Sequence, residues 1–136
     1  AILIIASLVG GFNQGEESTI LYIVGENEGF EGLKSNYSSE ETIVIISHII
    51  QGQDLDLEQM EIRGILNSYE DENRTVHIGT YDLEIHKLVD SEEVIENSFI
   101  IQPVERGHYT FSAEVYQPDS DGVILRSVTH KFMVSE

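Results

Sequence analysis

The chain has 136 residues, which is enough for one hydrophobic core of ordinary domain size and hardly enough for two. Its 25 acidic residues outnumber 7 basic ones, and the formal net charge of -18 at pH 7 repels the phosphates of nucleic acids and anionic membrane surfaces, which excludes both as partners. The absence of cysteine excludes disulfide bonds, thiolate nucleophiles and thiolate metal sites.

The chain opens with an uncharged apolar run at residues 2–9. As a helix this run would rise only about 13 Å against a bilayer core of about 30 Å, and Gly10 and Gly11 follow it at once, so we predict no membrane span in this chain. As an extended strand it would reach about 27 Å and be apolar on both faces. A strand of that kind has to be buried from both sides, because an exposed one would aggregate.

Three interpretations of this run stay open. It is an ordinary first strand of its own sheet, the remnant of a signal or membrane segment, or a donor strand that completes the sheet of a neighbouring copy. The donor interpretation predicts a head-to-tail homopolymer and divides the chain into an extension with a hinge, residues 1–13, and a folded domain, residues 14–136. The donor residues are then Ile2, Leu3, Ile4, Ile5, Leu8 and Val9, and the hinge residues are Gly10 and Gly11.

Short apolar runs rich in isoleucine, valine, threonine and tyrosine follow, with turn residues between them about every ten positions. This pattern is typical of the strands of a β-sandwich. The predicted strands span residues 19–24, 42–50, 59–66, 74–78, 81–89, 98–103, 108–116 and 123–134. Helix is expected only as short turns near residues 54–59 or 91–96.

Two of the predicted strands have informative faces. Residues 42–50 are apolar on both faces, so we expect a central strand that is covered on both sides or takes part in a subunit contact. Residues 108–116 alternate strictly, which predicts one face in the core and one in water. The buried face would carry Tyr109, Phe111, Ala113 and Val115. The polar turn residues at 117–122 predict a hairpin between the last two strands.

The stretch at residues 105–111, Glu-Arg-Gly-His-Tyr-Thr-Phe, resembles the acidic-x-Gly-x-Tyr-x-Cys corner of immunoglobulin-like domains. The resemblance implies that Tyr109 is the corner tyrosine, whose hydroxyl bonds back to the preceding turn, and that Phe111 replaces the second cysteine by apolar packing. Tryptophan is absent, which departs from the antibody pattern. We therefore predict an all-β, immunoglobulin-like sandwich of about seven to nine strands with an extra N-terminal hydrophobic strand.

The sequence contains no catalytic constellation, so we predict that the protein is not an enzyme. Its histidines stand in no metal-ligand spacing, and neither a Gly-x-Ser-x-Gly motif nor a phosphate loop occurs. Asp119 and Asp121 are candidate ligands of Ca²⁺, which needs several oxygen ligands at once, although turn formation explains the same residues; no other cofactor is predicted. The sequons at Asn36 and Asn73 are candidate glycosylation sites.

Two functional hypotheses follow from these features. The chain begins at Ala1 instead of methionine, so we expect removal of a leader and an extracellular or cell-surface location. The first hypothesis is a structural subunit of an extracellular filament, pilus or surface assembly, similar in design to the donor-strand surface fibres of archaea and bacteria. The alternative is a monomeric cell-surface adhesion module that binds carbohydrate, protein or Ca²⁺. The mass of the particle in solution distinguishes the two.

Overall fold

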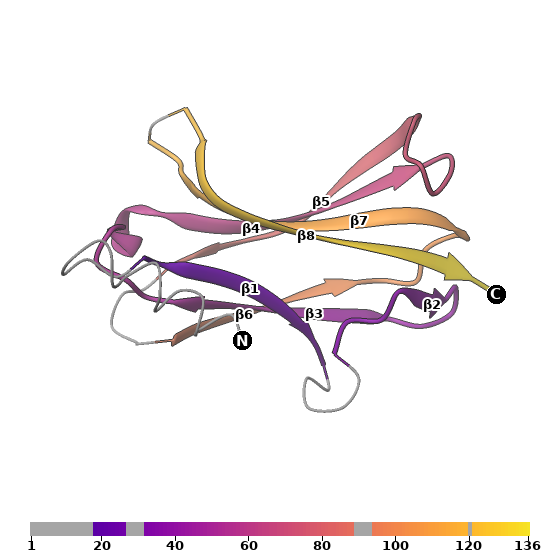
Figure 1. Ribbon diagram of the computed structural model, residues 1–136, viewed down its shortest axis with the longest axis horizontal. Helices are drawn as coiled ribbons and strands as arrows, with labels where there is room; N and C mark the ends of the chain where they lie inside the picture. The colour runs from indigo at the N-terminus through magenta and orange to yellow at the C-terminus, as the bar shows by residue number, and fades with distance from the viewer. Residues whose placement is uncertain (1–17, 27–31, 89–93, 120) are drawn as a thin grey trace.

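The computed structural model describes residues 18–26, 32–88, 94–119 and 121–136, which form two β-sheets packed face to face (Figure 1). The predicted donor residues and the glycine hinge lie outside the described residues. The elements are β1 (Ile20–Gly25), β2 (Asn36–Ser38), β3 (Ile43–Ile50), the 3₁₀ turn η1 (Leu57–Gln59), β4 (Glu61–Tyr69), β5 (His77–Lys87), β6 (Val94–Ile101), β7 (Gly107–Gln117) and β8 (Val123–Ser135).

The two sheets have different widths. One is a three-stranded antiparallel sheet in the order β1-β3-β6, and the other is a five-stranded sheet in the order β2-β8-β7-β4-β5. The pairs of the wider sheet are antiparallel except for β2, which runs parallel to β8. The predicted all-β, immunoglobulin-like sandwich is therefore confirmed for the described residues.

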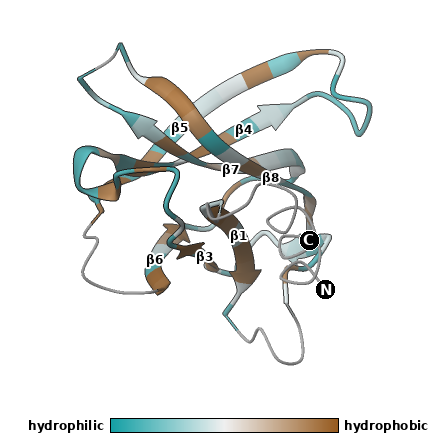
Figure 2. Cartoon of the chain, turned by 60° about the vertical axis from the view of Figure 1, so that its left-hand side comes forward, coloured by the Kyte–Doolittle hydropathy of each residue, from teal (hydrophilic) through white to brown (hydrophobic). Residues whose placement is uncertain are grey.

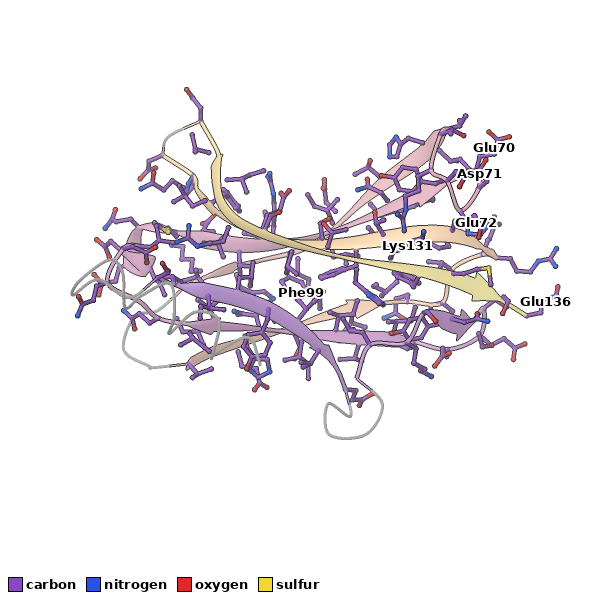
Figure 3. The ribbon with its side chains drawn as sticks, in the orientation of Figure 1. Glu70, Asp71, Glu72, Phe99, Lys131 and Glu136 are labelled. Atoms are coloured by element: carbon purple, nitrogen blue, oxygen red, sulfur yellow. The ribbon has the colours of Figure 1, made fainter. Side chains whose placement is uncertain are left out.

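The core lies between the sheets and is filled mainly by β-branched and aromatic side chains. The predicted core face of β7 is confirmed, since Tyr109, Phe111, Ala113 and Val115 are all at most 5% exposed. The opposite face is not in water as predicted, because Thr110 is also only 5% exposed. Phe111 packs against Phe99 of the opposite sheet with ring centroids 5.5 Å apart, and Figure 3 shows Phe99 between the two layers. Apolar packing of this kind joins the sheets without a disulfide.

The turn before β7 is closed by a tyrosine. The Tyr109 hydroxyl donates a hydrogen bond to the Glu105 carbonyl at 2.6 Å, and Gly107 between them has φ 159°. The Tyr109 ring stacks on Phe132 of β8 at 5.7 Å. Burial raises the pKa of this hydroxyl, because the ionised form would be poorly solvated. The side chain thereby links the start of β7 to the last strand.

Gly64 allows the two sheets to approach closely. A Cβ atom at this position of β4 would lie 2.6 Å from Phe99 Cδ1 and 3.0 Å from Phe111 Cε1. Both rings are fully buried, so neither has free space into which it could move. The pairing of β4 with β5 shifts its register between Arg63 and Ile65, next to this glycine. A side chain at position 64 would therefore strain the centre of the core.

Several predicted boundaries were wrong. The two strands expected at residues 74–78 and 81–89 are one strand, β5, because Gly79 pairs with Ser68 inside the ladder and does not make a turn. Strand β6 begins earlier than predicted, since Val94 already pairs with Ile50, and residues 94–96 are not helical. The short strand β2 was not predicted. The turn expected at residues 54–59 is η1, capped by the Asp56 carboxylate.

The predicted hairpin between the last two strands is confirmed. Strands β7 and β8 pair along their length from Gly107 to Gln117. Asp121 and Gly122 in the turn adopt left-handed backbone angles, with φ 57° and 68°. This hairpin and the β4–β5 hairpin project from opposite ends of the wider sheet (Figure 1), and Glu70, Asp71 and Glu72 lie at the tip of the latter (Figure 3).

Candidate interaction surface

The three-stranded sheet turns an apolar face outward. Its register places Ile45, Ser47 and Ile49 of β3 toward the core, all 0% exposed, so the residues of β3 that alternate with them point away from it. The same register aligns Tyr22 of β1 and Glu96 of β6 with His48 on that outer side. We call this surface the apolar outer face. Its apolar members are Ile20, Tyr22, Val24, Val44, Ile46, Ile50, Val94 and Ile100.

These side chains are accessible to a partner to different degrees. Val94 and Ile100 on β6 are 43% and 44% exposed, whereas the members on β1 and β3 are half-buried. At the centre the Tyr22 ring stacks on His48 with centroids 5.0 Å apart. Figure 2 shows β1 and β3 as mainly hydrophobic strands. The face is thus a continuous apolar surface and not a set of scattered side chains.

The charge of this face differs from that of the molecule. Among the described side chains that the register places on it, Glu96 is the only acidic residue, and none is a lysine or arginine. The whole chain carries a formal charge of -18. An approaching copy of the chain therefore meets the least electrostatic repulsion here. Polar rows on both sides of an apolar patch are typical of interaction surfaces.

The outer face of the wider sheet carries mostly polar side chains, although Ile85, which pairs with Arg63, is 62% exposed there. Arg63 Nε donates to Glu114 Oε1 at 2.8 Å, and its guanidinium carbon lies 4.6 Å from the centroid of the Tyr116 ring. The Thr80 hydroxyl donates to Asn67 Oδ1 at 2.7 Å. We call this surface the polar outer face. Several of its side chains therefore bind one another.

A polar clasp holds the beginning of β1. The Thr19 amide and hydroxyl both donate to Asp54 Oδ1 at 2.8 Å, and Arg126 of β8 donates from Nη2 to Asp54 Oδ2 and from Nε to the Thr19 carbonyl at 2.9 Å. Thr19 is only 2% exposed. Burial alone would raise the pKa of Asp54, but the hydrogen bonds from Thr19 and the charge of Arg126 outweigh it and lower the pKa.

The predicted ligands and sequons lie at the surface. Asp119 borders a hollow of about 310 Å³ with Glu58 and Glu61, and Asp121 is exposed in the adjoining turn. In the described part of the chain no three histidine, aspartate or glutamate side chains come together as a metal site. Asn36 and Asn73 are both exposed.

Sequence reasoning found only part of the interaction surface. The two apolar faces of residues 42–50 indicated the β3 side chains Val44, Ile46 and Ile50 in advance. The contributions of β1 and β6 were missed, because alternation along one strand does not tell which side of the sheet faces the core. The described residues include no helix whose length and apolar character would let it cross a bilayer.

No family model matches the chain, and no curated protein matches it. Among solved structures it is similar to a CARDB domain from Pyrococcus furiosus in complex with di-metal ions, with 13% identity, 87% of this chain and 88% of that chain covered, and a TM-score of 0.50. It is also similar to a sporulation control protein from Bacillus subtilis, with 12% identity, coverage of 88% and 50%, and a TM-score of 0.46.

A third similar structure is the major subunit of aggregative adherence fimbriae type I from Escherichia coli, with 12% identity, coverage of 88% and 95%, and a TM-score of 0.42. Similarity at this level of identity shows the fold alone, because one sandwich architecture carries many unrelated functions. The class that the fold defines is the immunoglobulin-like β-sandwich, and function has to be argued from the surface.

Proposed function

We propose that the protein is a structural subunit of an extracellular surface assembly, such as a filament or pilus, whose copies associate head to tail through apolar surfaces. The N-terminal run of residues 2–9 is the donated element in this proposal. The observation that supports it is the apolar outer face, which is nearly free of charge on a molecule with a net charge of -18. We also propose that the protein is not an enzyme.

Two copies associate only if the burial of apolar side chains outweighs the electrostatic repulsion between their acidic surfaces. Burying five or six large aliphatic side chains contributes on the order of 1.5–3 kcal/mol each before the cost of association is subtracted. A contact between acidic surfaces would oppose association instead. The contact that joins copies should therefore lie where carboxylates are few, as on the apolar outer face around Ile46 and Val44, where Glu96 is the single acidic residue among the described members. The exposed sequons at Asn36 and Asn73 lie outside that surface and are compatible with an extracellular location.

The first test uses one substitution on each outer face. We expect Ile46→Asp in the full chain to abolish assembly, because it places a charge in the centre of the apolar outer face. Thr129→Asp on the polar outer face is the control and should assemble as the unchanged chain does. Light scattering after size-exclusion chromatography measures the particle mass, and circular dichroism shows that both variants are folded. Assembly of Ile46→Asp at the unchanged level would refute the proposal.

The donor role has its own test. Deleting residues 1–11 should abolish polymers and leave a monomer or an unspecific aggregate. A chain that lacks these residues and still forms the same particles would show that the run is not donated. Electron microscopy of the purified full chain and of the shortened chain gives the comparison directly.

A second candidate function is a monomeric adhesion module that binds through the polar outer face. The Arg74 guanidinium carbon lies 5.8 Å from the centroid of the Tyr69 ring, and Arg74 Nε is buried without a hydrogen-bond partner in the described residues. His77 contacts the same tyrosine with centroids 5.4 Å apart. An aromatic ring beside such donors suits a sugar or an acidic peptide. A clean species of 15.3 kDa in solution would favour this function.

Calcium binding at Asp119 and Asp121 stays a prediction. Glu58 and Glu61 border the same hollow as Asp119, but the cationic side chain of Lys87 does so too, and these carboxylates do not come together as a metal site. Isothermal titration with CaCl₂ checks it, with Asp119→Asn as the comparison. An equal heat of binding for the unchanged chain and for Asp119→Asn would show that calcium does not bind at Asp119.

A further inference from the structure

We propose that the acceptor of the donated run is the apolar outer face of a neighbouring copy, over β1, β3 and β6. This inference rests on the proposed function and specifies where the contact is made. The occupant is the run of residues 2–9 of a second molecule. The following observations lead to this assignment.

The interior of the sandwich offers no vacant strand position within the described residues. Strand β8 occupies the place beside β7 from Gly107 to Gln117, and β3 is paired with β6 from Ile43 to Ile50 and with β1 from Ile45 to Ile50. The core between the sheets is filled, with Phe99 and Phe111 fully buried. A donated segment therefore has to bind on an outer face or at an edge, and the open edges among the described strands are those of β1 and β6, which border the apolar outer face, of β5, of β2, and of the part of β8 that β2 does not cover.

The free edge of β5 is a poor acceptor. It carries the exposed charged residues Asp82, Glu84 and Lys87, which interrupt its apolar side chains. The pairing of β5 with β4 also has two register irregularities, which bend the strand. Charges and bulges at an edge are features that oppose the addition of another strand.

The apolar outer face matches the run in chemistry and in length. Residues 2–9 carry no charge, and the face has the single acidic residue Glu96 among its described members. Strand β3 has 8 residues and so spans about 26 Å, as the run does when extended. Docking along β3 would cover Val44, Ile46 and Ile50 together.

The clasp at Thr19 fixes the point from which the N-terminal segment extends. Thr19 is bonded to Asp54 and Arg126, and Arg126 belongs to β8 of the opposite sheet. The chain is thus held on the side of β1 that faces β8.

Cysteine cross-linking tests the contact, because the chain contains no cysteine of its own. Full-length Ile5→Cys labelled with ¹⁵N is mixed with unlabelled Ile46→Cys and oxidised mildly. A disulfide requires the two Cα atoms to lie within about 7 Å, so it reports direct contact. We expect mass spectrometry to find a disulfide between the labelled and the unlabelled peptide. In the matched control, Thr129→Cys on the polar outer face replaces Ile46→Cys. We expect no disulfide between the labelled and the unlabelled peptide in that mixture.

Three results would overturn the inference. One is an equal yield with the Thr129→Cys control, which would indicate random collision. Another is a disulfide within single molecules of the double variant Ile5→Cys/Ile46→Cys, which would show that the run covers its own face. The third is a product formed only between two Ile46→Cys chains, which would show that the outer faces bind each other.

The outcome also separates this inference from the proposed function. If deletion of residues 1–11 abolishes assembly but Ile5→Cys forms no disulfide with Ile46→Cys, the acceptor lies elsewhere and the proposed function stands. If the full chain is a monomer under all conditions, the proposed function and the acceptor are both wrong.

Discussion

Single residues decide how β1 is held. Thr19, Asp54 and Arg126 are far apart in the chain, yet their hydrogen bonds join the first strand to the last one. Each partner satisfies another: Asp54 accepts from Thr19 and from Arg126, and the Arg126 Nε donates to the Thr19 carbonyl. Charge-assisted hydrogen bonds of this kind are stronger than neutral ones. The clasp therefore contributes to the stability of the folded domain.

The clasp predicts a pH dependence of stability. The folded-state pKa of Asp54 is lowered from the usual value of 3.8, so its contribution is present above that value and is lost as the pH falls through the folded-state pKa. We expect Asp54→Asn to lower the free energy of unfolding by about 1–3 kcal/mol at pH 7, with a smaller difference near pH 3. Urea unfolding at several pH values measures this.

The control for this prediction is Asp82→Asn at an exposed position of β5. It should leave the free energy of unfolding nearly unchanged at both pH values, since surface substitutions seldom alter it by more than about 0.5 kcal/mol. A pH-independent effect of Asp54→Asn would show that the lowered pKa does not contribute.

Individual strands differ in what they contribute. Strand β7 is half core and half surface, β3 lies at the centre of its sheet with apolar side chains on both sides, and β5 is a largely exposed edge. Strand β4 is the point of closest contact between the sheets, because Gly64 leaves room for the Phe99 ring. The three-stranded sheet packs stably on the five-stranded sheet because aromatic rings fill the space between them.

The close contact at Gly64 predicts that a single methyl group added there destabilises the fold. Gly64→Ala should lower the free energy of unfolding by about 1–3 kcal/mol, since the new Cβ would overlap buried rings. Gly79→Ala in the paired strand is the matched control, because its Cβ would lie 3.4 Å from Ser68 Oγ, an ordinary contact. Thermal and urea unfolding of both variants check this. Equal effects of the two substitutions would contradict the role assigned to Gly64.

The whole molecule combines strong like charge with one apolar face. Copies with a net charge of -18 repel each other at low ionic strength, and the apolar contact has to overcome that repulsion. Salt shortens the range of the repulsion, from about 30 Å at 0.01 M to about 3 Å at 1 M. Association should therefore strengthen as the ionic strength rises, whereas a contact between opposite charges would weaken.

The expected direction is stronger assembly at higher salt. Static light scattering over a NaCl series from about 0.01 M to about 1 M should show rising particle mass for the full chain. The Ile46→Asp variant should stay monomeric over the same range. Assembly that dissolves as salt is added would mean that ion pairs, and not the apolar outer face, join the copies.

The sequence by itself determined the local features of this protein. The alternation in β7, the turn before β8 and the two-faced strand at residues 42–50 were predictable, because each depends on neighbours within one strand or turn. The tertiary structure decided the rest. Alternation does not identify the partner of a strand, so the short parallel strand β2, the continuous β5 and the shared outer face of β1, β3 and β6 could not be derived. The clasp likewise joins residues 35 and 72 positions apart, and such contacts exist only once the chain has folded.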